Sequence, residues 1–108
     1  MPPTYIVKSA VKHESVDKRA IKDEIEKMGG FWSCVQGGMG SKPGDPDIVA
    51  CINGRYVAIE CKTPVGRLSK AQKDCRKAVI EAGGVHIVAR SKDEFLEAIS
   101  LNGLIKTD

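Results

Sequence analysis

The chain has 108 residues, of which 42% are hydrophobic and 29% charged, a composition typical of one globular domain and not of a disordered protein. No apolar run approaches the ~20 residues that a membrane-spanning helix needs, and Met1-Pro2-Pro3 is not followed by the segments of a signal peptide. The net charge of +3 permits a polyanionic partner. We expect a single domain over residues 1–108, with no membrane partner and a cytoplasmic location.

The first half of the chain predicts a helix followed by three strands. Residues 4–7 fit either a short strand or a loose arm. Apolar residues at helical spacing favour a helix over about 13–28, and the aromatic, β-branched run 31–35 favours a strand. Residues 47–52 and 55–62 form two further strands, because the Asn53-Gly54 pair between them is the strongest short-range signal for a two-residue hairpin turn.

The second half predicts helix, strand and helix. Ser69 and Gln72 have the spacing of a capping box at the start of a helix over about 69–82. Its expected buried stripe comprises Leu68, Ala71, Cys75, Ala78, Val79 and Ala82. A strand over 85–89 and a helix that begins after Ser91 follow. The predicted fold is α/β in the order α-β-β-β-α-β-α, with a mixed four-stranded central sheet flanked by helices and a right-handed parallel βαβ unit.

The four cysteines lie far apart and form no Cys-x-x-Cys pair. Three fall in predicted strands and one in a predicted helix: Cys34, Cys51, Cys61 and Cys75. We interpret them as reduced core cysteines of a cytosolic protein and not as a zinc site or as disulfides.

The predicted hairpin brings three charged residues to one end of one face. If Asn53-Gly54 is a two-residue turn, counting outward places Asp47 opposite Glu60, and Lys62 lies two residues further on the same face. The rest of both strands is apolar, so we expect the hairpin to be buried on both sides.

Two carboxylates that face each other in a buried hairpin repel, and folding does not need them there. A hard divalent cation removes the conflict, since Mg²⁺ binds one or two carboxylates together with waters and phosphate oxygens. A neighbouring lysine can orient a water or neutralise a phosphate. The alternative is that Asp47 begins a strand after a proline turn and that Glu60 and Lys62 are edge charges.

These residues resemble the motifs of the PD-(D/E)xK nuclease superfamily, in particular its small VRR-NUC branch, whose stand-alone members occur in phages and bacteria. The resemblance covers about residues 14–89. Its motifs are an acid in the first helix, a Pro-Asp pair, a Glu-x-Lys and a glutamine early in the next helix, here Glu14, Pro46-Asp47, Glu60-Cys61-Lys62 and Gln72. The resemblance implies a restriction-endonuclease-like fold, whose core has the same order of elements.

The resemblance also implies a role for each matching residue. Asp47 and Glu60 would bind Mg²⁺ or Mn²⁺, and the main-chain carbonyl of Cys61 would be a further ligand. Lys62 would assist the attacking water.

The two remaining motif residues have alternative explanations. Glu14 would reach the site from the first helix and hold metal-bound water or a second ion, or it is an ordinary first-turn acid stabilised by the helix dipole. Gln72 would hold Lys62 or a phosphate, and its place in a capping box is compatible with that role. Asp45 is expected to be a turn residue.

Basic residues crowd the second helix and the loop before it: Arg67, Lys70, Lys73, Arg76 and Lys77. We expect the helix N-terminus at Ser69, together with Lys42, Arg67, Lys70 and Lys73, to contact DNA phosphates. The alternative is an ordinary solvated helix face.

The resemblance implies an Mg²⁺- or Mn²⁺-dependent endonuclease that cuts branched DNA as a Holliday-junction resolvase does. It further implies a homodimer with C₂ symmetry, in a bacterial cell or a phage-infected host. The alternatives are a flap or nicking nuclease, an RNA-processing enzyme, and a nucleic-acid-binding module without catalysis.

Overall fold

The computed structural model describes residues 17–35 and 42–104. Along this part of the chain the elements are α2 (Lys18–Lys27), β1 (Phe31–Cys34), β2 (Ile48–Ile52), β3 (Arg55–Cys61), α3 (Lys70–Glu81), β4 (Val85–Ala89) and α4 (Lys92–Leu101). The predicted order is therefore confirmed. α2 begins at Lys18, with Asp17 as its N-cap, so it starts about five residues later than the helix predicted over 13–28. Residues 4–7 lie outside the described residues.

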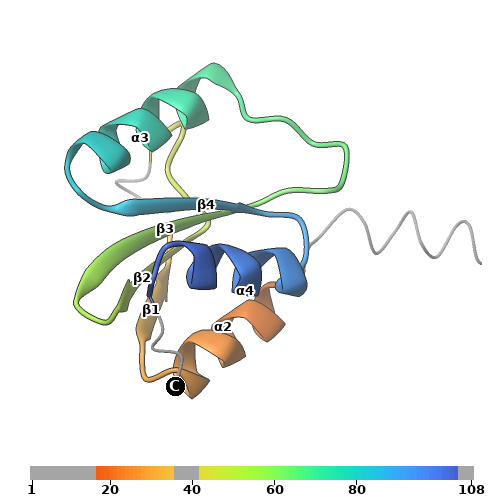
Figure 1. Cartoon of the computed structure of the whole chain (residues 1–108). Coiled ribbons are helices and arrows are strands. Elements are labelled where there is room, and N and C mark those ends of the chain that lie inside the picture. Colours follow the sequence, from red (N-terminus) through yellow and green to blue (C-terminus); the bar gives the residue numbers. More distant parts are fainter. Residues whose placement is uncertain (1–16, 36–41, 105–108) are drawn as a thin grey trace, which may run out of the picture.

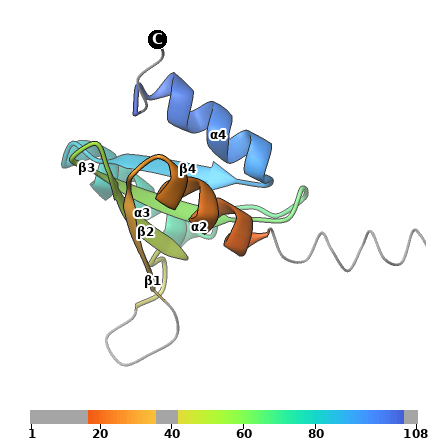
Figure 2. The same ribbon diagram turned by 90° about the horizontal axis from the view of Figure 1, so that it is seen from below.

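The four strands form one mixed sheet in the order β1-β2-β3-β4. β1, β2 and β3 pair antiparallel, and β4 pairs parallel to β3, as the predicted βαβ unit requires. Helices α2 and α4 cover one face of the sheet and α3 covers the other (Figure 1), and the view from below shows α2 and α4 on the same side (Figure 2). No helix in the described part of the chain has the length and apolarity that crossing a membrane requires.

The main core lies between the sheet and the pair α2 and α4. Alternate residues of three strands point into it, because side chains alternate between the two faces of a strand. Burial of each large apolar side chain contributes roughly 1.5–3 kcal/mol. The fully or nearly fully buried residues are Ile21, Ile25, Ile48, Ala50, Ile52, Val57, Ile59, Val85, Ile87, Ala89, Phe95, Ile99 and Leu104.

The opposite face of the sheet is covered less completely. No residue of α3 is fully buried, so the predicted buried stripe is wrong in part: four of its members are half-buried, while Ala78 and Ala82 are exposed. One helix with short inward side chains cannot cover four strands. The hairpin is therefore buried on both sides only near its open end, and Cys51 and Tyr56 are exposed near the turn.

The cysteine prediction needs the same correction. All four cysteines are free, as expected, but Cys34 and Cys51 are exposed, and Cys61 and Cys75 are half-buried. None is fully buried, although Cys61 packs against the core. Cys51 lies on the part of the sheet that α3 leaves uncovered.

A tight turn delivers Asp47 to the start of β2. The Asp45 N–H donates to the Lys42 carbonyl at 3.1 Å, with Pro43 and Gly44 between them and Gly44 at φ +93°. Proline followed by a glycine with positive φ is the pattern of a type II turn. Asp45 is thus a turn residue, as predicted, and its carboxylate accepts from the Lys42 N–H at 2.7 Å.

We expect Gly44→Ala to destabilise the fold more than Gly83→Ala does. Both glycines have a positive φ, but a Cβ on Gly44 would lie 2.4 Å from the main-chain oxygen of Ala71, whereas a Cβ on Gly83 meets nothing within 4 Å. Gly83→Ala should cost about 1 kcal/mol of backbone strain, and Gly44→Ala about 1–3 kcal/mol more, because the turn must move away from α3. Urea denaturation of both variants measures the difference, and equal losses would contradict the close packing.

Candidate metal centre

The hairpin has the predicted register. Five cross-strand pairs run from Ile52↔Arg55 to Ile48↔Ile59. Asn53 and Gly54 both have positive φ, at 52° and 77°, as a type I′ turn requires. Each strand is one residue shorter than predicted at the open end of the hairpin.

Asp47 therefore lies just outside the ladder, and the predicted direct pairing with Glu60 is not part of it. The Asp47 N–H donates to the Ile59 carbonyl at 3.1 Å, although Ile59 is already the partner of Ile48. Two residues opposite one is the arrangement of a β-bulge. The Asp47 carbonyl accepts from the Val35 N–H at 3.1 Å, so its main chain is bonded to both neighbouring segments.

The Asp47 carboxylate lies at the end of β3. Its Oδ2 accepts a hydrogen bond from the Cys61 N–H at 2.8 Å. Its Oδ1 lies 3.6 Å from the Nζ of Lys18, the first residue of α2. Asp47 is thus tied to the residue that follows Glu60, which keeps the two carboxylates together as the sequence predicts.

Glu60 is buried, with 2% of its surface exposed. Its Oε2 accepts a hydrogen bond of 2.6 Å from the Nε2 of Gln72, whereas its Oε1 is buried without a hydrogen-bond partner. Such an orphaned oxygen is costly in a protein interior. It points to a ligand or a proton that completes the site.

Gln72 serves the helix and the site together. Its N–H donates to the Ser69 Oγ at 3.1 Å, and its Oε1 accepts from the Ser69 N–H at 2.9 Å, which is the predicted capping box. Because Oε1 is used there, Nε2 must face Glu60, which settles the orientation of the amide. Gln72 thus bonds to Glu60, and its predicted contact with Lys62 or a phosphate stays a prediction.

The charges of the site oppose the ionisation of Glu60. The pKa of Glu60 is raised from its ordinary value of 4.5 to about 7, chiefly by burial and then by the negative charge of Asp47, while Lys62 opposes the rise. The nearby Asp47 carboxylate thus favours the protonated form of Glu60. The pair thus accepts one positive charge, a proton or a metal ion, more readily than it remains doubly ionised.

The donors present suit Mg²⁺ or Mn²⁺. Two carboxylates provide hard oxygen ligands, and such ions take their remaining ligands from waters and phosphate. Within 17–35 and 42–104, no group of three or more His, Cys, Asp and Glu side chains is placed to hold a metal ion. Burial raises the pKa of Cys61 to about 12, so its thiol stays protonated, and only its main-chain carbonyl can serve as the predicted ligand. Glu14 lies outside the described residues.

Lys18 is a site residue that the motifs did not indicate. It approaches Asp47 from α2, with about a third of its side chain exposed. It is the first residue of α2, directly after the N-cap Asp17, and the sequence holds no motif that marks it.

We expect Lys18→Met to raise the affinity for Mn²⁺ about two- to fivefold, because the ammonium competes with a divalent cation for Asp47. Isothermal titration with Mn²⁺ measures the effect. Lys27→Met is the matched control, since Lys27 pairs with Glu24 on the same helix. A lower Mn²⁺ affinity in Lys18→Met would show that Lys18 supports the site instead.

The predicted DNA contacts lie around the start of α3. Ser69 caps the helix, and Arg67 is exposed in the loop before it. Lys70 is 2.9 Å from a carboxylate one turn further along α3, so part of its charge is already neutralised. Lys73 lines a groove along α3, and Lys42 begins the turn that precedes Asp47.

The loop between β3 and α3 is fastened to the end of β4. The Lys62 N–H donates to the Ala89 carbonyl at 3.0 Å, and the Arg90 guanidinium donates to the Gly66 carbonyl at 3.0 Å. These bonds hold Lys62 beside the end of β3 and bring Ser69 back toward the carboxylates. No protein-family model, curated protein or solved structure matches this chain.

Proposed function

We propose that the protein is a metal-dependent endonuclease that hydrolyses phosphodiester bonds in branched DNA, with a restriction-endonuclease-like fold and a resemblance to the VRR-NUC branch of the PD-(D/E)xK nucleases. One observation carries the proposal: a buried glutamate with an orphaned oxygen lies beside a second carboxylate, at the end of a hairpin that carries Pro46-Asp47 and Glu60-Cys61-Lys62. The order of elements and the mixed sheet support it.

The residues divide the work as follows. Asp47 and Glu60 hold the cation, and Gln72 fixes the direction of the Glu60 carboxylate. A bound Mg²⁺ or Mn²⁺ supplies Lewis acidity toward a phosphate oxygen and lowers the pKa of water. Lys62, whose charge already acts on Glu60, orients the attacking water or neutralises the phosphate. The expected products have 5′-phosphate and 3′-hydroxyl ends.

A C₂ dimer is part of the proposal, because two symmetric cuts resolve a four-way junction. An exposed apolar row supports it: Phe31 pairs with Cys51, and Cys51 pairs with Tyr56, so the three share one face. Phe31 is 73% exposed and Tyr56 49%. Such rows on small domains mark interaction sites. The four free cysteines support the proposed reducing compartment, the cytoplasm of a bacterial or phage-infected cell.

We expect Phe31→Glu to turn the dimer into a monomer in sedimentation velocity, because a charge in the row must be desolvated at the interface. Leu101→Glu, at an equally exposed apolar residue of α4, should leave the dimer intact. Wild-type protein that sediments as a monomer would contradict the dimer and favour a flap or nicking nuclease.

A cleavage assay tests the function. Labelled four-way junction, flap and linear duplex are incubated with Mg²⁺ or Mn²⁺ and wild-type protein, Asp47→Ala or Lys62→Ala. We expect wild type to cut the junction and both variants to be inactive. Equal cleavage of linear duplex would reject branch specificity. Active variants would reject the site, and a wild type that binds DNA without cutting would favour a binding module.

A further inference from the structure

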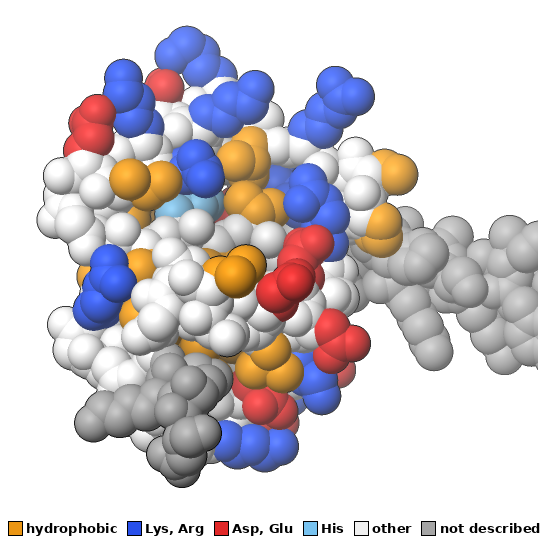
Figure 3. Space-filling model, in the orientation of Figure 1, with side chains coloured by type: hydrophobic (Ala, Val, Ile, Leu, Met, Phe, Trp, Pro, Cys, Tyr) orange, Lys and Arg blue, Asp and Glu red, His pale blue; other side chains and the backbone are white. Residues whose placement is uncertain are grey.

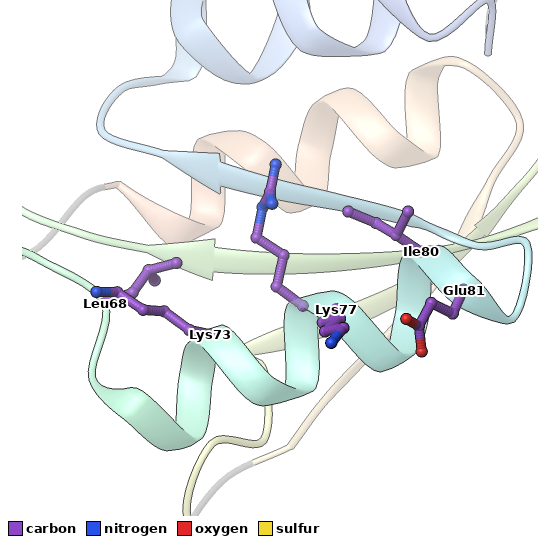
Figure 4. Close-up of a pocket in the computed structure, with 6 residues that line it drawn as sticks. Leu68, Lys73, Lys77, Ile80 and Glu81 are labelled. Atoms are coloured by element: carbon purple, nitrogen blue, oxygen red, sulfur yellow. The ribbon is translucent and has the colours of Figure 1, made fainter.

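A groove of about 670 Å³ runs along α3. Its lining residues are Leu68, Lys73, Arg76, Lys77, Ile80 and Glu81. Leu68 and Ile80 lie near its two ends, on the side of α3 toward β4, and the side chains of Lys73 and Lys77 lie between them (Figure 4). The volume falls in the range of pockets that enclose a small ligand, which is more space than a phosphate contact alone needs.

The groove combines cations with apolar surface. Lys73, Arg76 and Lys77 are exposed, and Ile80 is 46% exposed. Lys and Arg side chains gather with apolar ones over the α3 side of the molecule (Figure 3). This mixture suits an anionic partner that also offers apolar surface.

The groove continues from the candidate metal centre. Gln72, Arg76 and Ile80 are four residues apart, so they form one row along α3, and Lys73 and Lys77 form the adjacent row. Lys73 thus directly follows the glutamine that holds Glu60, and Arg76 lies about one turn, or roughly 6 Å along the helix axis, beyond it. A strand bound at the carboxylates can follow the helix into the groove without a bend away from the protein.

Arg76 also approaches the sheet. Burial and the charge of Arg76 lower the pKa of His86, which lies in β4. His86 is therefore neutral at pH 7, and the positive charge of the groove comes from its lysines and arginine alone. A charge that is independent of pH near neutrality suits a phosphate partner.

We propose that this groove seats one or two unpaired nucleotides of the strand that is cut, with phosphates on Lys73, Arg76 and Lys77 and the apolar faces of sugar and base against Leu68 and Ile80. The position of the cut rests on the proposed nuclease function, but the binding does not. Lys73 and Lys77 are about 6 Å apart along the helix axis, which spans roughly two phosphates of one strand. Paired bases are stacked inside a duplex and cannot reach the apolar floor, so the occupant is single-stranded.

Fluorescence anisotropy in EDTA tests the groove without cleavage. A labelled single-stranded oligonucleotide and the matched duplex are titrated over a series of salt concentrations. Lys73→Ala/Lys77→Ala is compared with Lys27→Ala/Lys92→Ala, which removes the same charge from α2 and α4. We expect only the groove variant to reduce the salt dependence of single-strand binding, by a log–log slope of about 1.4 for two lost phosphate contacts.

The apolar floor has its own test. Ile80→Ser should weaken single-strand binding about three- to tenfold with an unchanged salt slope and leave duplex binding unaltered. Leu101→Ser, at an exposed apolar residue of α4, should change neither. Thermal unfolding verifies that these surface variants fold.

Two results would contradict the proposed single-strand site. In one, the groove and control lysine pairs change the salt dependence of binding equally. In the other, Ile80→Ser weakens single-strand and duplex binding equally. The proposal also fails if wild-type protein binds an acidic peptide and binds no DNA. If wild-type protein cuts DNA but the groove variants bind it as well as wild type does, the groove proposal is rejected and the nuclease proposal is retained. If wild-type protein cuts no DNA but binds it through the groove, the groove proposal is retained and the nuclease proposal is rejected.

Discussion

Glu60→Gln is expected to abolish divalent-cation binding while it makes the metal-free fold more stable at pH 8. The folded-state pKa of Glu60, about 7, lies above its ordinary 4.5, so a proton on this residue stabilises the fold. That stabilisation is fully present below about pH 4.5 and is lost as the pH rises through about 7. Glutamine mimics the protonated form at every pH, so it should restore up to about 3 kcal/mol at pH 8 and little at pH 5.

Chemical denaturation in EDTA at both pH values measures this difference, and thermal shifts with Mn²⁺ measure the lost binding. Glu94→Gln is the control, because Glu94 caps α4 on the other face of the sheet, and no comparable gain at pH 8 is expected. A Glu60→Gln variant that is less stable than wild type at pH 8 would contradict the burial of an uncompensated charge.

Lys62→Met is expected to lower the cleavage rate at saturating DNA by about a hundredfold or more, with Mn²⁺ affinity retained or slightly raised. Lys62 lowers the pKa of Glu60, so its charge lies close to the carboxylates without ligating the ion. Loss of a group that acts on the water or on the developing charge typically costs two to three powers of ten.

Lys70→Met is the matched control, because Lys70 lies at the start of α3 and pairs with a carboxylate on that helix. It should affect DNA affinity and not the rate at saturation. A Lys62→Met rate close to that of wild type would remove Lys62 from the catalytic groups.

The hairpin shows how far the sequence could predict the site. Asn53-Gly54 permits one kind of two-residue turn, because both residues adopt positive φ at low cost. Once the turn is defined, every pair back to Ile48↔Ile59 follows from counting. The bulge at Asp47 could not be predicted by counting, because the Asp47 carbonyl is also bonded from the other side by the N–H of Val35, the residue after β1. Pairing with a third strand is a tertiary property.

The contribution of α2 was harder to predict. Apolar residues at helical spacing predicted the helix, whose buried residues are Ile21 and Ile25. Which polar residue reaches Asp47 depends on how the helix lies on the sheet, and Lys18 was therefore missed. The groove along α3 was missed for a related reason: the stripe expected to be buried is half-buried or exposed, and its member Leu68 lines the groove together with the exposed Ile80.

Titration with Mn²⁺ tests the central claim most directly, by calorimetry or by the electron paramagnetic resonance signal of the free ion. We expect wild-type protein to bind Mn²⁺ at the Asp47–Glu60 centre, Asp47→Asn to lose that binding, and Asp45→Asn to retain it, because the Asp45 carboxylate is engaged in the turn. Equal Mn²⁺ binding by wild type and Asp47→Asn would contradict the proposed centre.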